Sequence, residues 1–200
     1  MGSFAAALVA AGLGFGSLWL ATDGFRALTT DAALRVAVER APRALPAAAL
    51  TDQNGQALRL DDFEGRVVVV DFFYSRCADL CPILNDAMSR IRHALPPAAL
   101  DRDLVLLSIS FDREFDSTEE LARYARIFDA DGVTWRMVRV EDQDELDALL
   151  AAFGVVVIAD GRGGFQHNGA ILVVDREGRL SRIYDYDAPE AVAAEIGALL

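Results

Sequence analysis

The chain has 200 residues, which suits one domain with accessory segments, and 53% of them are hydrophobic, enough to supply a packed core. Its formal net charge of −12 argues against a nucleic-acid partner, because binding to phosphates needs a basic face. An acidic surface favours solubility, and it would also steer a basic partner toward the protein.

The N-terminal segment is apolar and carries no charge. Residues 4–22 read FAAALVAAGLGFGSLWLAT, close to the ~20 apolar residues that a helix needs to cross a bilayer. A cleaved signal peptide would need a basic start and small residues before the cleavage point, whereas cleavage after Ala21 would place Trp19 there. We therefore interpret residues 1–22 as an uncleaved membrane anchor that forms a transmembrane helix.

Residues 23–46 are interpreted as a tether, with a short helix predicted over residues 32–39 that Pro42 would end. Arg26 is the nearest positive residue after the apolar segment, and the positive-inside rule alone would place that side of the anchor in the cytoplasm. The globular domain is expected to span residues 47–200.

Within this domain, segments typical of strands alternate with segments typical of helices. The dipeptide Asn54-Gly55 indicates a hairpin. Strands are predicted over residues 67–74, 104–110, 134–140, 170–174 and 180–184, and helices over residues 79–95, 117–128, 142–153 and 189–200. This order predicts a layered α/β fold. A cysteine pair at the first junction from strand to helix narrows it to a thioredoxin-like fold, a central mixed sheet flanked by helices.

The pair, Cys77 and Cys81, contains the only cysteines of the chain and follows directly after the predicted strand over residues 67–74. The start of a helix is expected to lower the pKa of a thiol there. Positions i and i+4 share one face of a helix, so the two sulfurs could form a disulfide or hold one soft metal ion. Three residues separate the two cysteines, whereas redox motifs usually have two. The wider spacing suits binding of a metal ion better. The alternative is that both cysteines are buried, chemically inert and have no role in function.

His167 is the third candidate ligand. It lies in a Gly-rich loop just before the strand predicted over residues 170–174, whereas His93 is interpreted as a surface residue. A lone histidine in a loop is usually polar filler. Joined to two thiolates, however, it would complete a trigonal S₂N site that suits Cu(I) and accepts Cu(II) with rearrangement. Zinc would normally need a fourth ligand.

Two aspartates, Asp112 and Asp116, follow the second buried strand. In a layered α/β fold that end of the sheet also carries the cysteine loop. The aspartates would shape the site electrostatically or accept hydrogen bonds from N–H groups of that loop. The alternative is that they serve only as turn residues and helix caps.

These segments together resemble the Sco/SenC proteins, membrane-anchored thioredoxin-fold copper chaperones of cytochrome c oxidase assembly. The resemblance runs from Ala47 to about Pro189. It rests on segments in the family's order: LTDQNG at residues 50–55, DFEGR at 62–66, the C-x₃-C-P motif of Cys77, Cys81 and Pro82, SFDREFDS at 110–117 and FQHNGA at 165–170. The chain departs from the family at Ala78 and Arg113, where proline is common, and at residues 155–158, where a Tyr-rich stretch is expected.

The resemblance implies that Cys77, Cys81 and His167 are the copper ligands, with the domain on the periplasmic side of the membrane or its equivalent. It also implies the partners, which are the copper-bearing subunit of cytochrome c oxidase, other copper chaperones and the membrane. We therefore expect a metallochaperone that delivers copper to the oxidase. The alternative is a thiol–disulfide oxidoreductase that reduces the cysteines of the acceptor, in which Cys77 attacks and Cys81 resolves. The sequence leaves open whether the protein is also an enzyme.

Overall fold

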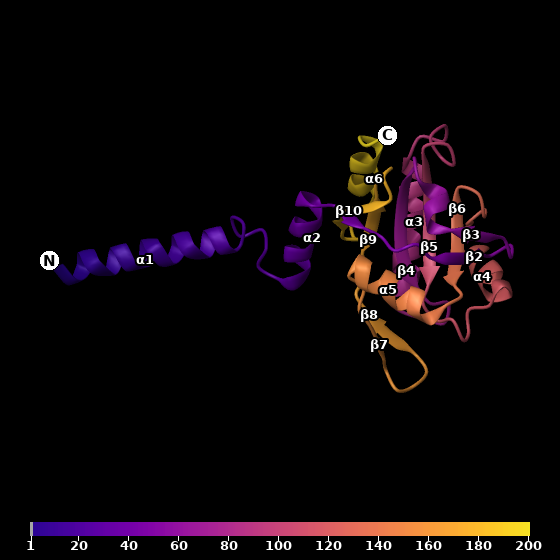
Figure 1. Cartoon of the computed structure of the whole chain (residues 1–200), viewed down its shortest axis with the longest axis horizontal. Coiled ribbons are helices and arrows are strands. Elements are labelled where there is room, and N and C mark those ends of the chain that lie inside the picture. Colours follow the sequence, from indigo (N-terminus) through magenta and orange to yellow (C-terminus); the bar gives the residue numbers. More distant parts are fainter. Residues whose placement is uncertain (1) are drawn as a thin grey trace. The chain divides into compact units, whose positions relative to one another are not determined.

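Figure 1 shows the computed structural model of the chain, which describes residues 2–200. The chain divides into two compact units, one that ends at Ala41 and one that spans Pro42–Leu200. The first unit contains α1 (Gly2–Ala21) and α2 (Thr30–Arg40). The hydroxyl of Thr29 caps α2 by accepting a hydrogen bond from the N–H of Ala32.

The predicted anchor segment does form a helix, α1. None of the helices within residues 2–200, however, has the length and apolar character required to cross a membrane. The prediction of a transmembrane helix over residues 1–22 is therefore not supported. That prediction rested on the absence of charge, and the same segment also contains Gly12, Gly14 and Gly16.

The second unit is built around an eight-stranded mixed sheet in the order β1-β10-β9-β4-β5-β6-β2-β3. Its centre is formed by β4 (Val67–Phe73), β5 (Leu104–Ser110) and β6 (Trp135–Val140), which run parallel to one another. Every residue of β4 and β5 is buried, as their runs of apolar and β-branched residues predict for strands covered on both faces. The outer strands pair antiparallel; they are β1 (Arg43–Ala44), β2 (Ala49–Asp52), β3 (Ala57–Arg59), β9 (Ile171–Val174) and β10 (Arg179–Tyr184).

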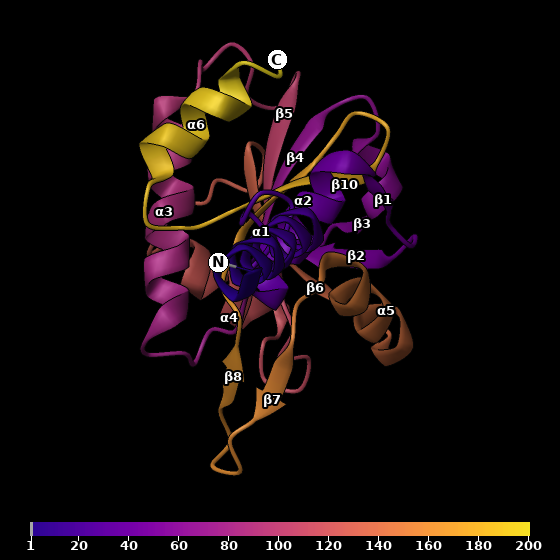
Figure 2. The same ribbon diagram turned by 90° about the vertical axis from the view of Figure 1, so that its left-hand side faces the viewer.

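Helices cover both faces of this sheet. They are η1 (Leu60–Phe63, a 3₁₀ turn), α3 (Leu80–Ala94), α4 (Thr118–Ala125), α5 (Gln143–Phe153) and α6 (Pro189–Gly197). Both α3 and α4 connect one parallel strand to the next in the same direction, so right-handed crossovers place them on the same face. Figure 2 shows α3 and α6 together on one side of the sheet and α5 on the other. The predicted mixed sheet flanked by helices is thus confirmed.

The predicted elements do not include a second and separate sheet of two strands. It is formed by β7 (Val157–Ala159) and β8 (Phe165–His167), which pair with each other in an antiparallel hairpin. This hairpin projects beyond the end of the main sheet (Figures 1 and 2). His167, predicted to lie in a loop, is the last residue of β8.

Candidate metal centre

The cysteine pair lies where β4 gives way to α3. Cys77 is in the turn between them, where its N–H donates to the carbonyl oxygen of Tyr74 at 3.2 Å. Cys81 is in the first turn of α3, which begins at Leu80. The prediction that both cysteines share one helix face is therefore wrong. Asp79, between them, has φ −110° and ψ −81°, which is not a helical conformation.

The first turn of α3 nevertheless donates a hydrogen bond to Cys77. The N–H of Cys81 donates to the Sγ atom of Cys77 at 3.3 Å, so a free amide of the first helical turn contacts that sulfur. Cys77 is half-buried and Cys81 is fully buried, and neither takes part in a disulfide.

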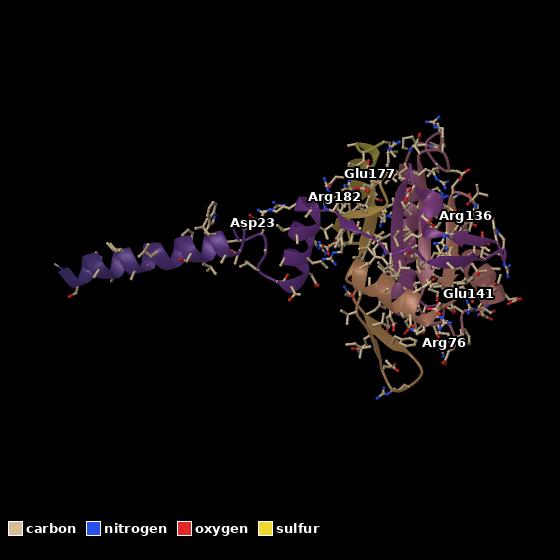
Figure 3. All side chains as sticks on the ribbon, viewed as in Figure 1. Asp23, Arg76, Arg136, Glu141, Glu177 and Arg182 are labelled. Carbon is tan, nitrogen blue, oxygen red and sulfur yellow. The ribbon has the colours of Figure 1, made fainter. Side chains whose placement is uncertain are left out.

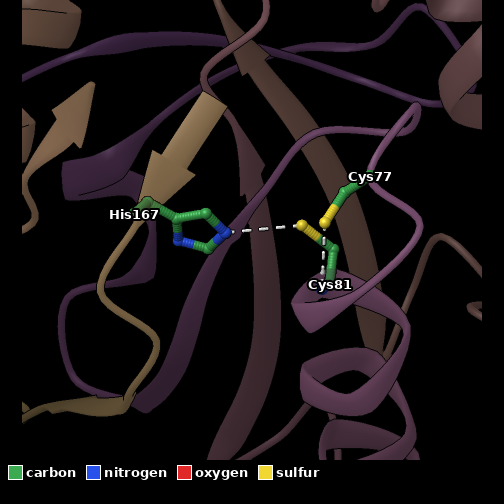
Figure 4. Close-up of side chains that lie close together, drawn as sticks. All are labelled: Cys77, Cys81 and His167. Atoms are coloured by element: carbon green, nitrogen blue, oxygen red, sulfur yellow. Dashed lines mark hydrogen bonds between the residues drawn. The ribbon is translucent and has the colours of Figure 1, made fainter. Parts of the chain in front are cut away.

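The structure brings the three predicted ligands together. The Sγ atom of Cys81 lies 3.4 Å from Nε2 of His167. The ligand atoms of Cys77, Cys81 and His167 all lie within 4.8 Å of one another. Figure 4 shows the three side chains pointing toward one another, from the turn, from α3 and from the end of β8. Two thiols and one imidazole at this separation form a soft donor set that could hold one metal ion.

Burial controls the protonation of this group. It raises the pKa of the Cys81 thiol, which outweighs the lowering expected at a helix start. It lowers the pKa of His167, which favours the neutral imidazole. In the tautomer with the proton on Nδ1, that nitrogen donates to the carbonyl oxygen of Asn168 at 3.2 Å, and Nε2 presents its lone pair toward Cys81.

The two aspartates hold the residues just before Cys77. Asp116 accepts a hydrogen bond from the N–H of Ser75 at 3.0 Å, and it also accepts from the hydroxyl of Ser75. Asp112 pairs with the guanidinium of Arg76 at 2.6 Å. The hypothesis that the aspartates accept hydrogen bonds from N–H groups of the cysteine loop is confirmed for Asp116, whereas Asp112 accepts from the side chain of Arg76. Figure 3 shows Arg76 at the end of the domain from which the β7–β8 hairpin projects.

Aromatic rings lie around His167, an arrangement that could not be predicted because the residues are far apart in the chain. The ring centroid of Phe111 lies 5.0 Å from that of His167, and the centroid of Tyr74 lies 6.5 Å from it. Phe165 contacts both Phe111 and Tyr74 edge to face. These rings exclude water from one side of the imidazole, which explains why its charged form is disfavoured.

A buried carboxyl, Asp71, was also missed. It lies in the middle of β4, and neither of its oxygens has a hydrogen-bond partner within residues 2–200. Burial raises the pKa of Asp71 to about 7. The pattern of the strand could not show that Asp71 is unusual, because all the remaining residues of β4 are apolar and buried.

Comparison with known proteins places this site in a family context. A model of the SCO1/SenC family matches residues 40–200. The SCO1 protein homolog of Bacillus subtilis is 24% identical over 136 residues, which is 67% of this chain and 69% of that protein.

Solved structures share the fold. The copper-bound ScoI of Bradyrhizobium japonicum superimposes with a TM-score of 0.67 at 24% identity, covering 78% of this chain and 99% of that one. A SCO1/SenC family lipoprotein from Bacillus anthracis has a TM-score of 0.71 at 22% identity, covering 80% and 98%. These likenesses show that the Pro42–Leu200 unit has the thioredoxin-like fold of the Sco proteins.

Proposed function

The chain belongs to the SCO1/SenC family, and on that basis we propose that it is a copper metallochaperone that serves cytochrome c oxidase during assembly of its copper centre. Copper binds to Cys77, Cys81 and His167. The observation that carries the proposal is that two thiols and one imidazole meet within 4.8 Å. The related ScoI of Bradyrhizobium japonicum binds copper, which supports the choice of metal.

The chemistry of the three side chains suits Cu(I). Thiolates are soft ligands that select Cu(I), and a neutral imidazole completes a three-ligand set. The thiols give up their protons when the metal binds. His167 needs no deprotonation, because burial already favours its neutral form. Cys77 is half-buried while Cys81 is fully buried, so a ligand of the acceptor would reach the metal from the side of Cys77.

The N-terminal unit offers a way to stay near the acceptor. α1 exposes large apolar side chains, among them Phe4, Leu13 and Leu20. We propose that this segment associates with the membrane on its extracytoplasmic side; the related protein from Bacillus anthracis is a lipoprotein, which supports an association with the membrane. Association with the membrane of the oxidase would raise the effective concentration of the chaperone there. Other copper chaperones would load the site.

A competition titration with Cu(I) on the reduced protein tests the ligand set. We expect one tightly bound copper per chain and at least about tenfold weaker binding in His167→Ala, a difference of about 1.4 kcal/mol. His93→Ala is the matched control, because His93 is an exposed histidine of α3 outside the site, and it should leave the affinity unchanged. Unchanged affinity in His167→Ala would refute the three-ligand site.

A thiol–disulfide oxidoreductase is the second candidate, favoured by the free thiols and by the amide that contacts Cys77. The Cys77 thiolate would attack a disulfide of the acceptor, forming a mixed disulfide and releasing one acceptor thiolate. The Cys81 thiolate would then attack the Cys77 sulfur, closing an intramolecular disulfide and releasing the second acceptor thiolate. This reaction does not use His167. Full reductase activity in His167→Ala, without tight copper binding in the wild type, would favour it over the chaperone.

A further inference from the structure

The strand that carries His167 does not belong to the main sheet. β8 pairs with β7, and the pair forms a sheet of its own. Asn168, next to His167, ties the base of the hairpin to the end of α5, since its side chain accepts from the N–H of Val156 at 2.7 Å and donates to the carbonyl oxygen of Gly154, the capping residue of α5, at 3.1 Å. These bonds hold the base of the hairpin to the end of α5, but neither of them reaches the cysteine turn or α3.

Tyr74 makes contacts with both of the segments that carry ligands. Its hydroxyl donates to the carbonyl oxygen of Phe165 and accepts from the N–H of Phe165, each at 3.2 Å. Its own carbonyl oxygen accepts the N–H of Cys77 at 3.2 Å. A single buried residue at the end of the cysteine-bearing strand is therefore bonded to the cysteine turn and to β8.

The aromatic contacts strengthen this connection. Phe165 and His167 are two residues apart in one strand, so their side chains point to the same side. The Tyr74 ring lies edge-on to both, with centroid distances of 5.3 Å to Phe165 and 6.5 Å to His167. The bonded hydroxyl fixes the main chain of β8, and the ring limits where the imidazole can move.

We propose that Tyr74 is a positioning residue that sets the distance between His167 and the cysteine pair. Its hydroxyl keeps Nε2 of His167 at the 3.4 Å separation from Sγ of Cys81. Removal of that hydroxyl leaves the N–H and the carbonyl of Phe165 without this partner, so β8 loses its bonds to the end of β4 and His167 can shift relative to α3, although Asn168 still holds the base of the hairpin. For copper binding, the inference rests on the proposed ligand set; for the metal-free protein, it stands on the geometry alone.

The test compares Tyr74→Phe with Tyr124→Phe. Tyr124 is also a buried tyrosine, but its hydroxyl has no hydrogen-bond partner within residues 2–200, so the control removes the same atom without breaking a bond. In the metal-free, reduced whole chain, NMR should show contacts between the ring protons of His167 and Phe111, whose centroids are 5.0 Å apart. We expect these contacts to be lost in Tyr74→Phe and kept in Tyr124→Phe. Retention of the contacts in Tyr74→Phe would overturn the proposal.

A Cu(I) titration extends the test to the metal. We expect Tyr74→Phe to weaken binding about tenfold, as is usual for residues that orient a metal ligand, and Tyr124→Phe to change it less than about twofold. In a His167→Ala background Tyr74→Phe should cause no further loss, because it acts through the histidine. An equal loss in both backgrounds would show that Tyr74 acts through the cysteine turn, and would overturn the proposal. If His167→Ala alone leaves the affinity unchanged, the ligand set fails, and the NMR comparison still decides the role of Tyr74.

Discussion

Replacing Asp71 with asparagine should stabilise the protein at neutral and alkaline pH. The carboxyl is fully buried in β4, neither of its oxygens makes a hydrogen bond to the part of the chain that the structure describes, and burial raises its pKa from 3.8 to about 7. A difference of about three pKa units, at about 1.4 kcal/mol each, makes the ionised folded state about 4 kcal/mol less stable than the protonated one. Asparagine keeps the size of the side chain and removes the charge.

The sign of the pH dependence follows from the proton balance. Between about pH 4 and pH 7 the folded wild type binds this proton while the unfolded chain has released it, so stability falls as pH rises through that window. Below this window the contribution of Asp71 is fully present, and above it the loss is complete. The gain in Asp71→Asn should therefore grow from near zero at pH 4 to about 4 kcal/mol at pH 8.

Urea unfolding of the whole reduced chain at pH 4.5, 6 and 8 measures this gain. A Trp19→Phe background leaves Trp135, buried in β6, as the fluorescent reporter. Burial also raises the pKa of Asp116, but that contribution is common to both proteins and cancels in the comparison. Asp52→Asn is a matched control that should destabilise, because it breaks the pair between buried Asp52 and Arg136. A gain in Asp71→Asn that does not change with pH, or a loss at pH 8, would refute the reasoning.

Two further predictions concern the metal and the cysteine turn. Copper affinity should rise with pH, about tenfold per pH unit for each proton released, because burial keeps the Cys81 thiol protonated until the metal displaces its proton; competition titrations from pH 6 to 8 check this, and a flat profile would contradict it. Arg76→Ala should lower stability by about 1–3 kcal/mol in urea unfolding, because it leaves the buried carboxylate of Asp112 without its ion-pair partner. Loss of the contact between the Arg76 guanidinium and the Phe115 ring, 4.4 Å from its centroid, adds to this effect. Unchanged stability in Arg76→Ala would show that Asp112 is satisfied in another way.

The core of the fold could be predicted from the sequence because its strands are unambiguous. The runs that form β4 and β5 are 7 residues long, which suits a strand and is short for a helix, and β4 also begins with consecutive valines. The cysteine turn follows one of these strands directly, and this fixed its place at one end of the sheet. The distance between His167 and the cysteines could not be predicted, because it depends on the β7–β8 hairpin, which lies about 80 residues further along the chain.

The start of α3 was predictable in part. Pro82 is the third residue of the helix, where its missing N–H is not needed, so a helix that contains it must begin only a residue or two earlier. This signal alone excludes Cys77 from the helix. The notion of a shared helix face arose from spacing alone, without regard to the proline.

The β7–β8 hairpin and Tyr74 could not be predicted for a physical reason. Each strand of the hairpin has three residues, and a Gly-rich turn separates them, so no period of two can be recognised. The role of Tyr74 depends on the place of Phe165, which follows it by 91 residues. Asp71 was missed because an apolar pattern says nothing about whether one polar residue inside it finds a partner.

X-ray absorption at the copper edge of the loaded, reduced protein tests the central claim most directly, because it counts the atoms bound to the metal. We predict a first shell of two sulfurs and one nitrogen, from Cys77, Cys81 and His167, and the loss of the nitrogen in His167→Ala with the sulfurs retained. A shell that is identical in the wild type and in His167→Ala would contradict the three-ligand copper site.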